Sequence, residues 1–138
     1  MHCHKLSGDI GRRFLLVLVD GEELIAELGR FASEQGIAAA EFTGIGSFSS
    51  VQLTGGRGCA AADIRSLDGR LELAGGSAKV VAYTVVSTHA GESCAGLLRR
   101  GVVRGAVKLV FTEGYSGSRA RPFSTETRPS AVKERRTS

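Results

Sequence analysis

The chain has 138 residues, of which 42% are hydrophobic and 23% are charged, so it can form one soluble domain with a core of its own. Its longest apolar runs, such as Phe14–Val19, are far shorter than the roughly 20 residues that span a bilayer, which excludes a membrane protein. No apolar stretch follows Lys5 near the N-terminus, so we expect no signal peptide and a cytoplasmic protein. The three cysteines are widely spaced and include no CxxC pair, which favours reduced thiols over a disulfide framework.

The formal net charge of +4 is carried by the C-terminal end of the chain. Residues 1–118 hold 12 basic and 12 acidic side chains, whereas residues 119–138 hold six basic and two acidic ones. A neutral body argues against a globular face that neutralises many phosphates. We therefore predict one domain over residues 1–118 and a basic, poorly ordered tail over residues 119–138, which is either only solvated or a weak contact for an anionic partner.

The first two elements are a strand and a helix. Branched and aromatic side chains over Arg13–Val19 predict a strand with both faces covered. From Glu22 the period changes to that of an amphipathic helix of about four turns, with Gly36 placed as its C-terminal cap. The apolar positions of this helix are Leu24, Ile25, Leu28, Phe31 and Ala32.

The rest of the body is predicted to be strands joined by short turns. Glycines 44 and 46 predict a bulge or a close backbone approach. Asp68-Gly69 predicts a two-residue hairpin turn, and a loop is expected around Gly91. The expected strands cover residues 37–42, 51–53, 64–67, 70–73, 79–88 and 102–111. This order predicts an α+β domain with a largely antiparallel β-sheet packed by one main amphipathic helix.

The sequence contains no recognised cofactor-binding loop, and we expect no cofactor. Gly44-Ile45-Gly46 would need a third glycine at position 49 to match a dinucleotide-binding fingerprint, and Ser49 stands there. The glycine-rich stretch over residues 55–58 lacks the lysine of a P-loop. Nucleotide binding through either motif is therefore excluded.

Two groups of residues could hold a metal ion or carry nucleophilic chemistry. His2, Cys3 and His4 are expected at an unsupported chain end, where adventitious metal binding is the simpler interpretation. His89 and Cys94 flank a predicted turn, and a cysteine beside a histidine can become a thiolate nucleophile. No third residue orients the histidine, so a loop histidine and a packed thiol are the favoured interpretation.

Three short motifs occur in one order along the chain: Gly21-Glu22-Glu23-Leu24, Gly44-Ile45-Gly46-Ser47, and Asp63-Ile64-Arg65-Ser66-Leu67-Asp68-Gly69. In this order the chain resembles the plants and prokaryotes conserved (PPC) domain family over residues 10–115. That family is also described as a domain of unknown function, and in plants it accompanies AT-hook DNA-binding motifs. The resemblance implies an α+β fold with an antiparallel sheet packed by a helix, and a homotrimer as the usual assembly.

The resemblance also implies where a metal site would lie. Prokaryotic members carry an HxH pair on a strand and a GGH triplet after the next loop, three histidines suited to one divalent metal. Ala82 and Thr84 stand where the pair would be, and the stretch ending at Gly96 stands where the triplet would be. All three histidines are absent, and neither an alanine methyl nor a lone threonine can hold zinc. We therefore expect no bound metal.

A second feature linked to the family lies in the tail. Arg119-Ala120-Arg121-Pro122 differs by one residue from the Arg-Gly-Arg-Pro core of an AT-hook, in which both arginines enter a narrow minor groove. The alanine adds a methyl group where the glycine lets the backbone approach the groove floor. The preceding residues supply no cations, so a chance near-match is the favoured interpretation and any nucleic-acid contact through Arg119 and Arg121 is expected to be weak.

The leading hypothesis is a non-enzymatic, metal-free, homo-oligomeric PPC-like domain that acts in assembly and binding, with a homotrimer expected. The alternative is an enzyme or a small-molecule-binding protein that uses the pocket left by the missing histidines. Its candidate polar groups are Tyr83, Thr84, His89 and Cys94. A closed apolar cluster around Ala82 and Gly96 would favour the first, and a concave pocket with convergent polar atoms would favour the second.

Overall fold

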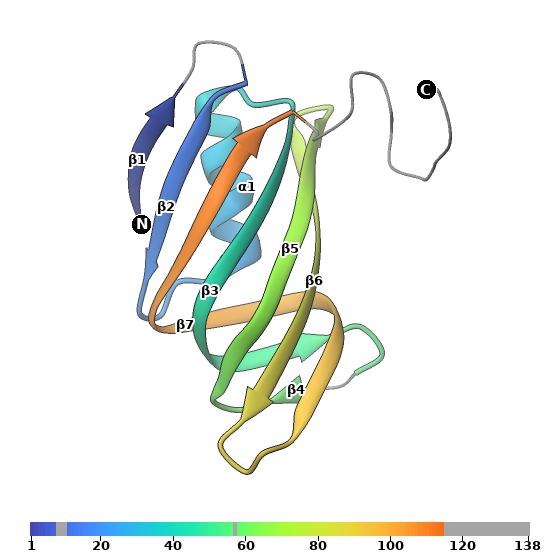
Figure 1. Ribbon diagram of the computed structural model, residues 1–138. Helices are drawn as coiled ribbons and strands as arrows, with labels where there is room; N and C mark the ends of the chain where they lie inside the picture. Colours follow the sequence, from blue (N-terminus) through green and yellow to red (C-terminus); the bar gives the residue numbers. More distant parts are fainter. Residues whose placement is uncertain (8–10, 57, 115–138) are drawn as a thin grey trace, which may run out of the picture.

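The computed structural model describes residues 1–7, 11–56 and 58–114. Within them a seven-stranded sheet lies against one helix, which is seen behind the sheet in Figure 1. The elements in chain order are β1 (His2–Ser7), β2 (Arg13–Val19), α1 (Leu24–Gln35), β3 (Ala39–Leu53), β4 (Gly58–Cys59), β5 (Ala62–Ala74), β6 (Ser77–Thr88) and β7 (Ser93–Glu113). The strand order is β1-β2-β7-β6-β5-β3-β4 and all of these pairings are antiparallel, as the sequence predicts for the sheet.

Two long strands, β3 and β7, close part of the sheet into a barrel-like ring. They pair along most of their length, from Ala40 opposite Glu113 to Leu53 opposite Leu98. The first part of β7 also pairs with β6, β6 pairs with β5, and β5 pairs with β3. The ring β3-β5-β6-β7 therefore has no free edge between these strands.

The glycines of β3 are required where the two long strands cross. A Cβ at Gly46, whose φ is +141°, would collide with the carbonyl oxygen of Ala106 on β7. The register of β3 against β5 shifts between Thr43 and Ser47, at the same place. The predicted strands over 37–42 and 51–53 are thus two ends of one bent strand, and the glycines mark the bend.

The helix begins and ends at capping residues. The carboxylate of Glu23 accepts hydrogen bonds from the backbone N–H groups of Ile25 and Ala26, at 3.1 and 3.0 Å. At the other end Gly36 has a left-handed backbone with φ of +66°. Phe31 lies on the buried side, and its ring makes edge contacts with the rings of Phe14 on β2 and Phe111 on β7.

The predicted hairpin turn at Asp68-Gly69 is wrong, because both residues lie inside β5. Gly69 is needed for a different reason: a Cβ there would meet the ring of Phe42 and the carbonyl oxygen of Val81. The chain turns instead after Ala74, between β5 and β6. The glycine lets two strands and a ring approach closely, which a local turn rule cannot distinguish from a turn.

The N-terminal residues form a paired strand, which corrects the expected unsupported end. β1 pairs with β2, with His2 opposite Val17 and His4 opposite Leu15. The terminal ammonium of Met1 also forms an ion pair with Glu22, 2.7 Å away. A further difference lies in β7, which begins nine residues before the predicted strand over 102–111.

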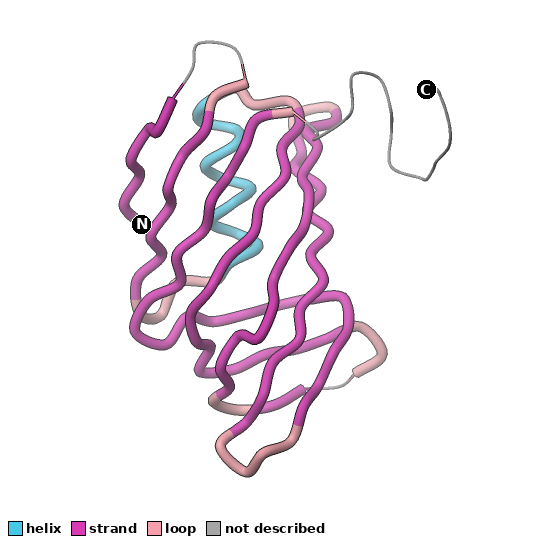
Figure 2. The backbone as a smooth tube through the Cα atoms, in the orientation of Figure 1, coloured by secondary structure: helices cyan, strands magenta, loops and turns pink. Residues whose placement is uncertain are grey.

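The two faces of the sheet have different surroundings, as Figure 2 shows. The helix covers one face, and the core lies there, with Leu16, Phe42 and Leu109 fully or almost fully buried. The opposite face of the sheet carries no helix within the described residues. No helix in the described part of the chain has the length and apolar character needed to cross a bilayer.

Candidate binding surface on the open face of the sheet

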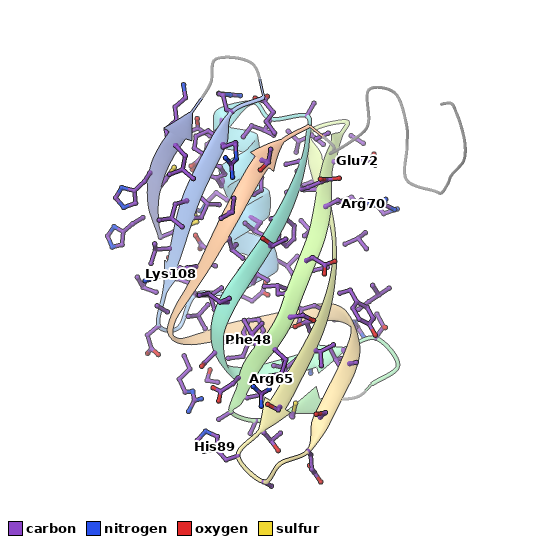
Figure 3. The ribbon with its side chains drawn as sticks, viewed as in Figure 1. Phe48, Arg65, Arg70, Glu72, His89 and Lys108 are labelled. Carbon is purple, nitrogen blue, oxygen red and sulfur yellow. The ribbon has the colours of Figure 1, made fainter. Side chains whose placement is uncertain are left out.

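The face of the sheet opposite α1, called the open face below, is formed by side chains that alternate with core residues. Cross-strand pairing joins them into rows, one of which runs from Leu15 through Val110, Thr43 and Asp68 to Tyr83. The residues of the open face include Leu15, Val17, Glu41, Thr43, Ile45, Asp68, Arg70, Val81, Tyr83, Leu97, Lys108 and Val110. Figure 3 views the molecule from this side, with Lys108 on β7 and Arg70 on β5.

Large apolar side chains are exposed on the open face. Ile45 is 67% exposed, Tyr83 is 47% exposed and Leu97 is 43% exposed. Tyr83 and Leu97 are cross-strand partners, so their side chains lie side by side. Three large apolar side chains on one face form the kind of surface that proteins use for contacts with other proteins.

A hollow of about 260 Å³ lies in the open face over β3, β5 and β6. Its lining residues are Glu41, Phe42, Thr43, Asp68, Gly69, Arg70, Val81, Tyr83 and Leu97. Glu41 pairs with Arg70, and Asp68 pairs with Tyr83, so charged groups of both signs and a phenol surround an apolar floor. Such a lining suits either a side chain of another protein or a small molecule with a polar end.

Of the residues that stand at the positions of the metal histidines, Ala82 and Thr84 are buried and Gly96 is half-buried. Ala82 is 1% exposed, and Thr84 is fully buried with its hydroxyl donating to the carbonyl oxygen of Ser66 at 2.8 Å. Gly96 pairs with Thr84, and a Cβ placed on it would contact Leu53. Ala82 and Thr84 therefore face the interior, and none of the three residues presents a polar side-chain atom to the hollow.

The three polar candidates are placed in different surroundings. Tyr83 lines the hollow, whereas His89 is exposed in the turn between β6 and β7. Cys94 is half-buried and packs against the core. Within the described residues there is no group of three histidine, cysteine or carboxylate side chains that could hold a metal ion.

A second polar cluster lies where β3, β5, β6 and β7 meet, around Asp63. Its carboxylate accepts hydrogen bonds from the hydroxyl of Ser47 at 2.8 Å and from the guanidinium of Arg104 at 3.2 Å. The hydrogen bond from Ser47 and the nearby positive charges of Arg104 and Arg65 lower the pKa of Asp63. Asp63 is thus held ionised and already bonded, which is the behaviour of a structural ion pair.

Sequence reasoning missed Glu41, Thr43, Asp68 and Arg70 as lining residues of the hollow. These residues lie on two strands, and only the register of β3 against β5 brings them together. The single local signal was the alternation of polar and apolar residues along each strand. It predicts which face of the sheet a side chain occupies, but not which residues of the adjacent strands lie beside it. Arg119 and Arg121 lie outside the described residues.

The fold and the open face define a class of small domain in which a bent antiparallel sheet, closed into a ring, packs on one helix. A family model described as the Plants and Prokaryotes Conserved (PCC) domain matches residues 5–114, and the chain belongs to this family. No curated protein sequence matches the chain.

Solved structures show the same fold at low sequence identity. A "putative DNA-binding protein" from Bacteroides thetaiotaomicron has a TM-score of 0.70 and 20% identity, over 83% of this chain and 84% of that one. A plant- and prokaryote-conserved protein from Pyrococcus horikoshii has a TM-score of 0.68 and 22% identity, over 83% of each chain. A metal-containing protein from Archaeoglobus fulgidus has a TM-score of 0.64 and 23% identity, over 76% of this chain and 81% of that one.

Proposed function

We propose that this domain assembles with copies of itself through the open face, as a homotrimer, and acts as a non-enzymatic module for assembly and binding. The observation that carries the proposal is the group of exposed apolar side chains Ile45, Tyr83 and Leu97 on one face of the sheet. Covering them removes apolar surface from water, which stabilises an assembly by roughly 25 cal/mol for each Å² buried. A second copy is the occupant we propose.

The charges of the open face also suit association between identical surfaces. Glu41 and Asp68 are acidic, and Arg70 and Lys108 are basic, so the face carries charges of both signs. Around a threefold axis the same face of three copies converges, and charges of one sign on that face would repel one another. The buried surroundings of Ala82 and Thr84 support a non-enzymatic role, because no polar atom of theirs is available to a substrate.

The test compares two substitutions that add the same charge. Ile45→Arg places a guanidinium on the open face, and Ala26→Arg places one on the exposed side of α1, on the other side of the sheet. Light scattering of the full chain at micromolar concentration should report a trimer for the parent and for Ala26→Arg, and a smaller species for Ile45→Arg. A monomeric parent chain, or equal effects of the two substitutions, would contradict the proposal.

A second candidate function is the binding of a small molecule in the hollow at Tyr83. The observation that favours it is the hollow of about 260 Å³. Its lining combines the carboxylates of Glu41 and Asp68 with the guanidinium of Arg70 and the phenol of Tyr83. Native mass spectrometry of the purified protein reports the subunit number and any retained ligand or ion together. A bound organic mass that is lost on Tyr83→Leu would favour this candidate over assembly alone.

Contact with nucleic acid is proposed only as a weak property of the tail. The Bacteroides thetaiotaomicron protein of the same fold is described as a "putative DNA-binding protein", which supports testing DNA binding in this chain. Residues 119–138 carry the positive charge excess, and an interaction of this kind depends steeply on salt and little on sequence. Selective binding to A·T-rich duplex through Arg119 and Arg121 would contradict this assignment.

A further inference from the structure

The part of the barrel formed by β3, β4 and the first half of β7 carries two neighbouring arginines at an irregularity in β7. Gln52 of β3 pairs with Arg100 and Leu53 pairs with Leu98, so Arg99 is an extra residue in β7. Two residues of one strand opposite one residue of its partner form a β-bulge. Leu98 is buried, whereas Arg99 and Arg100 are both exposed. The bulge therefore turns two successive guanidinium groups outward, where strict alternation would turn one of them inward.

The guanidinium groups of Arg99 and Arg100 have no hydrogen-bond or ion-pair partner within residues 1–7, 11–56 and 58–114. Two other arginines among the described residues of this end are already bonded: Arg104 to Asp63 at 3.2 Å, and Arg65 to the hydroxyl of Ser87 at 2.9 Å. The carboxylate of Asp63 is thus bonded without the bulge arginines. Two adjacent positive charges repel each other, and an anion placed between them removes that repulsion.

Each arginine of the bulge borders a hollow. The larger hollow has a volume of about 530 Å³ and is lined by Ser50, Val51, Gln52, Gly58, Cys59, Ala60 and Arg100. The smaller one has a volume of about 90 Å³ and is lined by Gln52, Leu53, Gly56, Gly58 and Arg99. Gln52 and Gly58 line both, so the two hollows adjoin at the bulge. Neither shares a lining residue with the hollow at Tyr83.

We propose that Arg99, Arg100 and Gln52, called the arginine bulge, bind the phosphate group of a small phosphorylated molecule whose remainder lies in the larger hollow. Guanidinium groups match phosphate oxygens with paired N–H donors, and each arginine brings five such donors. The amide of Gln52 and the hydroxyl of Ser50 add uncharged donors at the same hollow. Its volume falls in the range of small-ligand sites, about 300–1,000 Å³.

The arginine bulge shares no residue with the open face, although both include parts of β3 and β7. The experiment uses the full chain and two probes, inorganic pyrophosphate and adenosine monophosphate, in isothermal titration calorimetry. Arg99→Gln/Arg100→Gln removes the bulge charges. Arg65→Gln/Arg104→Gln removes the same number of charges from the same end of the barrel, and serves as the matched control. The tail is present in every protein compared, so its cations contribute equally.

We expect Arg99→Gln/Arg100→Gln to weaken the binding of both probes at least about 10-fold, because two charge-assisted hydrogen bonds are lost. The control variant should change the affinity for the probes less than about 2-fold. Arg100→Lys keeps the charge and loses the paired donors, so it should also weaken binding while circular dichroism remains that of the parent. This third variant tests the site even where the double variant fails to fold.

Three outcomes would overturn the proposal. Equal weakening by the bulge and control variants would show that only the general charge of this end attracts phosphate. No heat of binding from either probe at millimolar concentration would show that no site exists. Duplex DNA that binds through Arg99 and Arg100 more tightly than adenosine monophosphate would assign the arginines to a nucleic-acid backbone and not to a small ligand.

Discussion

Replacing Phe31 by alanine should lower the free energy of unfolding by about 3–5 kcal/mol. The side chain is 3% exposed and fills the space between α1 and the sheet. Its ring centroid lies 5.1 Å from that of Phe14, at an interplanar angle of 83°, and 5.4 Å from that of Phe111, at 90°. Truncation removes the buried apolar surface and leaves a cavity between one helix and two strands, which can only partly close.

A second substitution separates ring geometry from volume. Phe31→Leu keeps most of the volume and loses both edge contacts, each of which contributes about 0.5–1.5 kcal/mol, so a loss of about 1–3 kcal/mol is expected. Combining it with Phe14→Leu in a double-mutant cycle should give a coupling energy of about 0.5–1.5 kcal/mol for one ring pair.

The assay is equilibrium unfolding in urea followed by far-ultraviolet circular dichroism. All variants are compared at one protein concentration, because assembly makes the apparent stability depend on concentration. Ser33→Ala, an exposed position on the same helix, is the control and should change stability by less than about 0.5 kcal/mol. A loss below about 1 kcal/mol for Phe31→Ala would refute the reasoning, since it would mean that this side of α1 does not hold the helix on the sheet.

Three further predictions concern other parts of the chain. The hydrogen bonds from Arg12 lower the pKa of Glu113, so their stabilisation is present at neutral pH and is lost as pH falls through that lowered pKa. Arg12→Gln should therefore reduce the thermal unfolding temperature more at pH 7 than in acid, where only the contacts of Arg12 with Gln35 and Phe14 remain to be lost. An equal reduction at both pH values would contradict the linkage. Gly69→Ala should lower the free energy of unfolding in urea by about 1–3 kcal/mol, because the added methyl group overpacks the space between the strands. As a control, Asp68→Ala at the neighbouring exposed position should change stability by less than about 0.5 kcal/mol. An unchanged stability of Gly69→Ala would show that the strands can separate at no cost. A chain ending at Ser118 should keep its circular dichroism and oligomeric state and lose the DNA affinity of the full chain in a filter-binding assay, and retained affinity would place the DNA contact in the body.

The sequence by itself determined the elements that depend on local signals. The strand Arg13–Val19 has the predicted bounds, and the helix ends at Gly36 as its capping preference indicates. A strand of branched residues was expected over 79–88, and β6 covers Ser77–Thr88. In each case neighbouring residues specify the conformation through period, propensity or a cap, so no distant contact is needed to predict it.

The same local rules failed where a distant segment decides the conformation. Asp68-Gly69 has the composition of a hairpin turn, yet Phe42 from β3 and Val81 from β6 occupy the space beside Gly69 and keep it in a strand. The N-terminal strand was missed because its pairing with β2 supplies its order, and its own residues carry no strand pattern.

Only the tertiary structure decided which side chains share a surface. Tyr83 and Asp68 meet through the register of β5 against β6, and Arg99 becomes an outward-facing residue because β7 has one residue more than β3 at Gln52. Register is set by the packing of whole strands, and a shift of one residue moves every side chain to the other face. Ala82 and Thr84 lie in the core, and a register shift of one residue would place them on the open face. A sequence can therefore identify the residues of a strand and leave undetermined which face of the sheet each side chain occupies.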